Sequence, residues 1–168
     1  MKKIIIVLMS VAVSISTFAQ TKNVVAIAAG SADHTTLVAA LKAADLVNTL
    51  NGKGPFTVFA PTNAAFEKLP DGTLAMLLKP ESKTQLSKIL TYHVISGNLD
   101  AASVVAAIKS GNGKAVVTTV GGGKLTASLE KDKVKLTDES GSSAYVTTAD
   151  LKGSNGVVHV IDSIVMPK

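Results

Sequence analysis

Three histidines and two glycine-rich segments are the parts of this 168-residue chain that could carry chemistry. His34, His93 and His159 lie far apart in the sequence, and no two of them have the spacing of zinc ligands on one helix. The chain contains no cysteine, which excludes thiol catalysis, thiolate metal sites and disulfide bonds. We therefore expect neither a bound metal nor a cofactor.

The glycine-rich segments lack the residues that phosphate binding or nucleophilic catalysis would need. Residues 121–124 read GGGK but are followed by Leu125, whereas a phosphate-binding loop continues with Ser or Thr into a helix. Residues 153–156 read GSNG, which does not have the spacing of a nucleophile elbow. The sequence thus predicts a protein that is not an enzyme. A secreted hydrolase with a dispersed Ser/His/Asp site stays open as an alternative, because such a triad leaves no local pattern.

The N-terminus has the features of an export signal. Lys2 and Lys3 precede an apolar run over residues 4–13, and Thr17 and Ala19 are small residues at a cleavage site. The apolar run is shorter than the ~20 residues that a membrane-spanning helix needs. We expect residues 1–19 to be a cleaved signal peptide and residues 20–168 to be one secreted domain, extracellular or periplasmic, without stable membrane insertion.

The charge of the chain argues against a nucleic-acid partner. The net charge is +5, all the cations are lysines scattered along the chain, and tryptophan is absent. Nucleic-acid-binding surfaces usually cluster Arg and Lys with aromatic side chains that stack on bases. We interpret the positive charge as a contribution to solubility.

The first half of the secreted part is predicted to be mainly helical. Apolar side chains recur at helical spacing between residues 37 and 50, with Asp33 placed to cap the helix. Residues 56–59 are aromatic and β-branched and predict a buried strand, after which Thr62 or Asn63 can cap a short helix. Further helices are expected near residues 74–78 and 80–90, followed by a strand over residues 91–95.

The second half is predicted to be mainly β. Asp100 is placed to cap one more helix, whose inner side carries Val104, Val105 and Ile108. Residues 125–129 and 133–137 alternate apolar and polar side chains around a short turn, which predicts an antiparallel hairpin. Residues 144–149 predict a further strand. Residues 157–165 are apolar on both faces apart from His159, Asp162 and Ser163, and they predict a strand in the middle of a sheet. Helices followed by strands are typical of an α+β fold with a largely antiparallel sheet.

Three segments match the signatures of a known family in order and spacing. Residues 54–66 read GPFTVFAPTNAAF, residues 92–95 read YHVI, and residues 155–167 read NGVVHVIDSIVMP. Together they resemble the opening signature, the central Tyr-His motif and the closing signature of the fasciclin domain. The residues of these signatures that we single out are Thr57, Ala60, Pro61, Thr62, Asn63, Tyr92, His93, Asn155, Gly156, His159, Ile161 and Asp162. The resemblance covers nearly all of the secreted chain and implies a single fasciclin-like domain.

The resemblance also implies a fold and a role. The fold would be a β-wedge of two mainly antiparallel sheets with a helical cluster packed on one side. The role would be a non-enzymatic one in cell adhesion, extracellular-matrix interaction or surface attachment such as biofilm formation. The partner would be an extracellular or cell-surface protein or glycan, with weak self-association also possible.

Two interpretations of the signature residues remain open at this stage. Tyr92 and His93 either stabilise the fold as buried, hydrogen-bonded side chains or form part of an adhesive surface, as the resemblance implies. The family also associates an aspartate beside an isoleucine with adhesion, and Ile161 and Asp162 match it only in reversed order. A small-molecule or lipid-binding protein is the main alternative function, because apolar helices on a sheet can enclose a pocket.

Overall fold

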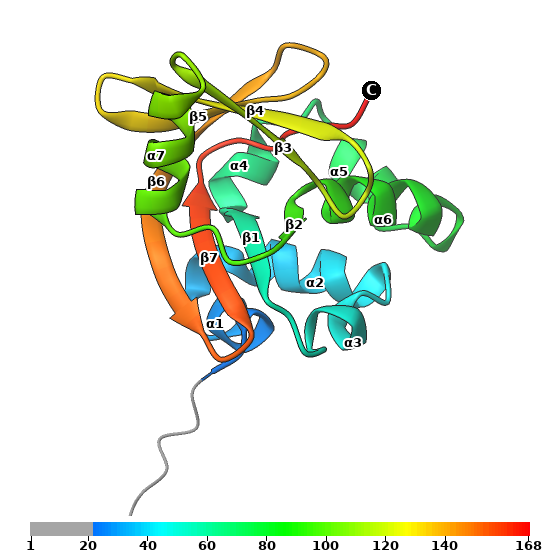
Figure 1. The fold of residues 1–168 in the computed structure, drawn as a ribbon. Helices are drawn as coiled ribbons and strands as arrows, with labels where there is room; N and C mark the ends of the chain where they lie inside the picture. The colour runs from blue at the N-terminus through cyan, green and yellow to red at the C-terminus, as the bar shows by residue number, and fades with distance from the viewer. Residues whose placement is uncertain (1–21) are drawn as a thin grey trace, which may run out of the picture.

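The computed structural model describes residues 22–168, so the expected signal peptide over residues 1–19 lies outside the described residues. Most of the helices precede most of the strands along the chain (Figure 1). The helices are α1 (Val24–Ala29), η1 (Ala32–His34), α2 (Thr35–Ala43), α3 (Val47–Leu50), α4 (Asn63–Glu67), α5 (Thr73–Leu77), η2 (Pro80–Ser82), α6 (Lys83–Tyr92) and α7 (Ala101–Ser110). None of the helices in the described part has the length and apolar character to cross a membrane.

The strands form one mixed sheet with the order β2-β1-β7-β6-β5-β4-β3. They are β1 (Phe56–Pro61), β2 (Val94–Ser96), β3 (Lys114–Thr118), β4 (Lys124–Glu130), β5 (Lys133–Thr137), β6 (Ser143–Gly153) and β7 (Gly156–Ile161). The pair β1–β7 is parallel and the other neighbouring pairs are antiparallel. The α+β class, the β4–β5 hairpin and the central position of β7 are therefore confirmed.

The expectation of two sheets is wrong, because β6 joins what would be two halves. Its first residues, Ser143 to Tyr145, pair with β5, and its later part, from Val146 to Gly153, pairs with β7. Register shifts within β6 bend the strand, as bulges do, so one continuous strand turns from one half of the sheet into the other. Beyond β3, the Val120 N–H donates to the Val94 carbonyl of β2, which brings the two ends of the sheet together and nearly closes it.

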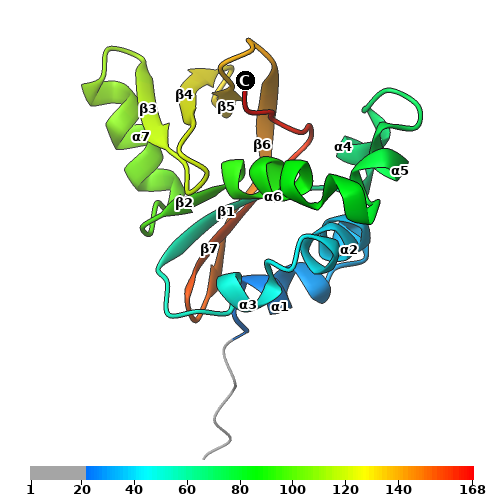
Figure 2. The same ribbon diagram turned by 90° about the vertical axis from the view of Figure 1, so that its right-hand side faces the viewer.

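The side chains of β1 and β7 alternate between two hydrophobic clusters. Val58 and Val158 belong to the cluster that α1, α2 and α6 cover. Phe59 and Ile161 belong to the second cluster, which includes side chains of α7 and of β3 to β5. The expected helical cluster therefore covers one face, but α7 packs apart from it, beside β3 and β4 (Figure 2). Burial on both faces explains why Val157, Val158, Val160 and Ile161 are all apolar. The strand expected over residues 157–165 is wrong for its last four residues, because β7 ends at Ile161, before the polar Asp162 and Ser163.

Three local expectations have different outcomes. The cap at Asp100 is confirmed, because its carboxylate accepts the Ser103 N–H at 2.8 Å. The cap at Asp33 is wrong, because Ser31 starts the short helix η1, which already contains Asp33 and leads into α2. The strand expected over residues 91–95 is wrong for its first residues. Helix α6 continues to Tyr92, where the Thr91 hydroxyl donates back to the Ser87 carbonyl at 2.7 Å.

Candidate functional site

Tyr92 lies at the end of α6 with its ring in the second hydrophobic cluster and is 1% exposed. Its hydroxyl donates to the Lys124 carbonyl at 2.6 Å and accepts the Glu139 N–H at 3.4 Å. Burial raises the pKa of Tyr92. The side chain thus ties α6 to β4 and to the loop between β5 and β6. Its polar atom is occupied by the backbone, which leaves no free group for a partner.

His93 follows α6 directly and is 2% exposed. Nδ1 lies 2.8 Å from the Ile89 carbonyl, and Nε2 accepts the Val165 N–H at 3.3 Å. These contacts assign the proton to Nδ1. Burial lowers the pKa of His93 to about 4, although the Ile89 carbonyl and Asp138 act in the opposite direction. The neutral ring therefore connects α6 to the C-terminal segment, and it can reach an external partner only if the fold opens locally.

His159, in β7, connects the loop before α7 to strand β6 in the same way. Nε2 lies 2.7 Å from the Leu99 carbonyl, and Nδ1 accepts the Asp150 N–H at 3.3 Å. The ring stacks on Phe59 with the centroids 5.7 Å apart. His159 and His93 thus both bond to backbone groups, and neither is hydrogen-bonded to a serine hydroxyl. This arrangement gives no support to a Ser/His/Asp site at either residue.

The opening signature builds the connection from β1 to α4. Thr57 is fully buried, and its hydroxyl donates to the Gly97 carbonyl at 2.8 Å and accepts the Leu99 N–H at 2.9 Å. Ala60 and Pro61 are buried in β1. Of the two candidate caps, it is Thr62 that caps α4. The Asn63 side chain instead accepts the Thr36 N–H at 3.0 Å and so connects α4 to the start of α2.

The closing signature is anchored at the turn between β6 and β7. The Asn155 amide donates to the carbonyls of Leu50 and Gly52, at 2.7 and 2.9 Å, and its oxygen accepts the Val24 N–H at 2.9 Å. At Gly156 a Cβ atom would clash with the Phe56 carbonyl, so a side chain there would push β1 and β7 apart.

Ile161 and Asp162, the pair that the resemblance associates with adhesion, lie at the end of β7. Ile161 is fully buried, whereas the Asp162 side chain is partly exposed. The Asp162 carboxylate accepts the Tyr145 N–H at 2.8 Å, and its carbonyl accepts from Lys68 at 2.7 Å. Tyr92, His93 and Ile161 are thus internal, and Asp162 alone of these four has substantial exposure. An adhesive role for this group stays a prediction.

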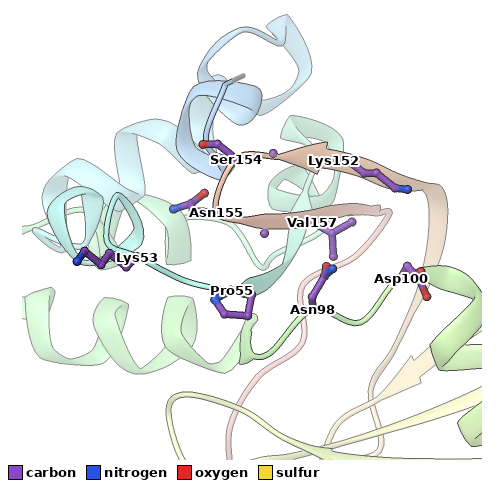
Figure 3. Close-up of a pocket in the computed structure, with 10 residues that line it drawn as sticks. Lys53, Pro55, Asn98, Asp100, Lys152, Ser154, Asn155 and Val157 are labelled. Carbon is purple, nitrogen blue, oxygen red and sulfur yellow. The ribbon is translucent and has the colours of Figure 1, made fainter. Parts of the chain in front are cut away.

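The structure also shows an open groove of about 570 Å³ that the sequence did not indicate (Figure 3). Three segments form it: the loop before β1, the loop before α7, and the turn between β6 and β7. Its lining residues are Lys53, Pro55, Asn98, Asp100, Lys152, Gly153, Ser154, Asn155, Gly156 and Val157. No local motif could reveal this groove, because its residues are spread over about a hundred positions of the chain. The family signatures contribute Pro55, Asn155, Gly156 and Val157 to this lining, and the sequence indicated Asp100 as a helix cap alone.

Charged groups lie at both ends of this groove. Lys53 and Lys152 flank it, and Asp100 lies near Lys152 (Figure 3). Hydrogen bonds from Ser103 hold the pKa of Asp100 below its usual value, and the charge of Lys152 lowers it further. Across residues 22–168, no three His, Asp or Glu side chains gather as metal ligands. The groove can therefore supply hydrogen bonds and ion pairs to a ligand.

A second, smaller cavity lies between α1, η1 and the strands β6 and β7. Its volume is about 210 Å³, and it is lined by Ile27, Ala28, Ser31, Asp33, His34, Thr148, Leu151, Val158 and Val160. His34 is 5% exposed, and neither of its ring nitrogens has a hydrogen-bond partner within the described residues. Burial lowers the pKa of His34, which favours the neutral ring. Buried polar atoms are nearly always paired, so His34 is an unusual group at the wall of a cavity.

The fold and its internal contacts define an α+β domain whose signature side chains stabilise the backbone. The family model of the fasciclin domain matches residues 32–167. The chain therefore belongs to the fasciclin family, whose known members are generally non-enzymatic.

Individual relatives agree with this assignment. Protein sll1483 of Synechocystis sp. is 49% identical over 145 residues, which cover 86% of this chain and 73% of the relative. The cell surface glycolipoprotein MPB83 of Mycobacterium bovis is 37% identical over 123 residues, which cover 73% of this chain and 48% of the relative. A solved FAS1 domain pair from the insect cell adhesion molecule fasciclin I aligns with a TM-score of 0.61 and 23% identity. That alignment covers 77% of this chain and 43% of the other, and it shows a shared fold.

Proposed function

We propose that this protein is a secreted, non-enzymatic interaction module that binds a component of the cell surface or the extracellular matrix. The observation that carries the proposal is that the signature side chains make their hydrogen bonds inside the fold. The polar atoms of Tyr92, His93 and His159 all bond to backbone groups, so these signature side chains support the fold. The name of a relative, the cell surface glycolipoprotein MPB83, agrees with a surface role.

Export is part of this proposal. The features of residues 1–19 support cleavage after Ala19 and a mature protein that begins at Gln20. Mass spectrometry of the protein recovered from outside the cytoplasm tests this start directly. A chain recovered with residues 1–19 intact would contradict cleavage.

The binding role is tested with the mature protein, residues 20–168. The protein is labelled and incubated with intact cells of its source and with separated envelope and matrix fractions. We expect binding to one fraction that saturates and that unlabelled protein displaces. Deletion of the gene should reduce attachment to surfaces, and added mature protein should restore it. Failure of the folded, exported protein to bind any fraction, together with unchanged attachment, would refute the proposal.

The His34 cavity favours a second candidate function, the binding of a small molecule. Its walls are mainly apolar, with Ile27, Leu151 and Val160 among them, and it adjoins an unpaired buried ring. A small, mostly apolar molecule with a hydroxyl or carbonyl group would match this combination. Native mass spectrometry of protein purified from its source tests this candidate. A ligand retained by the wild type and lost in His34→Phe would support it, and a ligand-free mass spectrum would count against it.

A further inference from the structure

The geometry of the open groove points to a short acidic oligosaccharide as its ligand, one with sugar carboxylates on separate residues and hydroxyls between them. This inference rests on the proposed function, because it assigns a chemical class to the bound surface component and a place where it binds.

The size and position of the groove suit a small ligand that arrives from outside. Its volume of about 570 Å³ falls within the range of about 300–1,000 Å³ that is typical of small-molecule sites. Lys53, Asn98, Lys152 and Ser154 are exposed and come from all three of its segments. The turn that carries Ser154 is fixed in place by the hydrogen bonds of Asn155 to Leu50 and Gly52. The polar groups are therefore held on a rigid base and available to a ligand.

The two lysines determine which charge the ligand carries. Within the described residues the ion pairs are Lys68–Asp162, Lys83–Asp45 and Lys135–Glu130, and none of them includes Lys53 or Lys152. Lys152 lies close enough to Asp100 to act on its charge but forms no direct ion pair with it, so both ammonium groups can still contact a ligand. They lie toward opposite ends of the groove (Figure 3). Two separated cations fit two separated negative charges better than they fit one compact anion. A ligand with carboxylates on different sugar residues meets this condition.

The groups between the lysines determine the rest of the ligand. Asn98 offers an amide and Ser154 a hydroxyl, and each can both donate and accept hydrogen bonds. The Asp100 carboxylate accepts the Ser103 N–H through one oxygen, and it favours a hydroxyl donor over a further anion. Pro55 and Val157 add a small apolar area. Sugar rings present this mixture of hydroxyls and apolar faces. A nucleotide is disfavoured because the groove has no aromatic side chain for base stacking.

The test uses trigalacturonic acid as the acidic probe, with maltotriose and inorganic phosphate as comparisons. The mature protein is titrated with each, and the amide NMR signals of Asn98, Ser154 and their neighbours report binding at the groove. We expect saturable shifts at these positions with trigalacturonic acid, weakening as the salt concentration rises. Maltotriose and phosphate should bind much more weakly.

A matched pair of variants isolates the lysines of the groove. The double variant Lys53→Gln/Lys152→Gln should weaken the binding of trigalacturonic acid about tenfold, the order expected when two exposed charge pairs are lost. The control Lys88→Gln/Lys109→Gln removes the same charge from exposed positions on α6 and α7 and should leave binding unchanged. Circular dichroism and thermal unfolding verify that both variants are folded.

Several outcomes would overturn the inference. These are the absence of saturable binding of trigalacturonic acid, equal loss in both double variants, or binding of phosphate as strong as that of the trisaccharide. The cell-fraction assay separates this inference from the proposed function. Suppose that the wild-type protein no longer binds a fraction that was treated with protease beforehand, while added oligosaccharide does not compete with its binding to the untreated fraction. The partner in that fraction is then a protein. In that case the glycan ligand is wrong and the surface role stands.

Discussion

The buried ring of His93 predicts a specific loss of stability in acid. In the folded protein the pKa of His93 is lowered from 6.5 to about 4, chiefly by burial. The unfolded chain therefore binds a proton at this residue at a higher pH than the folded chain does. The stability that the neutral ring contributes is complete above about pH 6.5. It is lost progressively as the pH falls from 6.5 toward 4.

The size of this effect follows from the same pKa values. A pKa lowered from 6.5 to about 4 corresponds to about 3 kcal/mol of unfolding free energy between neutral pH and pH 4. Protonation would also remove the acceptor for the Val165 N–H, because Nε2 would then carry a hydrogen. We expect the C-terminal segment to loosen first, which hydrogen exchange at Val165 and Met166 would detect.

The assay compares the wild type with His93→Gln, which has no imidazole at position 93. Urea denaturation followed by circular dichroism from pH 4 to pH 8 gives the unfolding free energy at each pH. The variant should be less stable at pH 7 by about 1–3 kcal/mol, since the buried hydrogen bonds of His93 are disturbed. Between pH 7 and pH 4, the unfolding free energy of the variant should fall by about 3 kcal/mol less than that of the wild type. Lys88→Gln, an exposed change on the same helix, serves as the control and should follow the wild type. Parallel pH profiles for the wild type and His93→Gln would refute the reasoning.

Three further predictions concern stability and are measured by thermal or urea unfolding. Asn155→Ala should cost about 2–4 kcal/mol because the Val24 N–H and two carbonyls lose their partner, and Asn155→Asp should cost at least as much, because a carboxylate oxygen would replace the amide donor and face the Leu50 and Gly52 carbonyls. A cost below about 0.5 kcal/mol for Asn155→Ala would contradict this role for the side chain. Gly123→Ala should lower the melting temperature, because the added Cβ would clash with the Tyr92 ring, and an unchanged value would mean that the ring can move aside. Thr62→Ala should destabilise the protein by about 1 kcal/mol through loss of the α4 cap, whereas Thr62→Ser should stay near the wild type, and equal effects of the two would argue against capping.

Local patterns predicted many of the elements, since these depend on neighbouring residues. The alternation in residues 125–129 and 133–137 predicted the hairpin, and Asp100 predicted the start of α7. Local patterns were wrong where tertiary contacts outweigh propensity. Thr91 and Tyr92 favour a strand, yet they close α6, because Tyr92 fills the core between the helix and β4.

The candidate groove was beyond prediction from local patterns. Lys53, Asn98 and Lys152 have no motif in common, and each is an ordinary exposed polar residue of a loop or strand end. The unpaired ring of His34 was equally hidden, because hydrogen-bond partners depend on which backbone groups the fold brings close.

The sequence by itself determined the family and the α+β class of this protein, because three signatures and the apolar periodicity are written in contiguous residues. The tertiary structure alone decided that the strands form one nearly closed sheet, since this depends on the bend of β6 and its pairing with both β5 and β7. It also decided that His93 and His159 form hydrogen bonds with backbone groups of distant segments. The charged groove likewise forms only because the fold brings three distant segments together. Contacts between residues far apart in the chain leave no periodic trace in the sequence, so they appear only once the chain is folded.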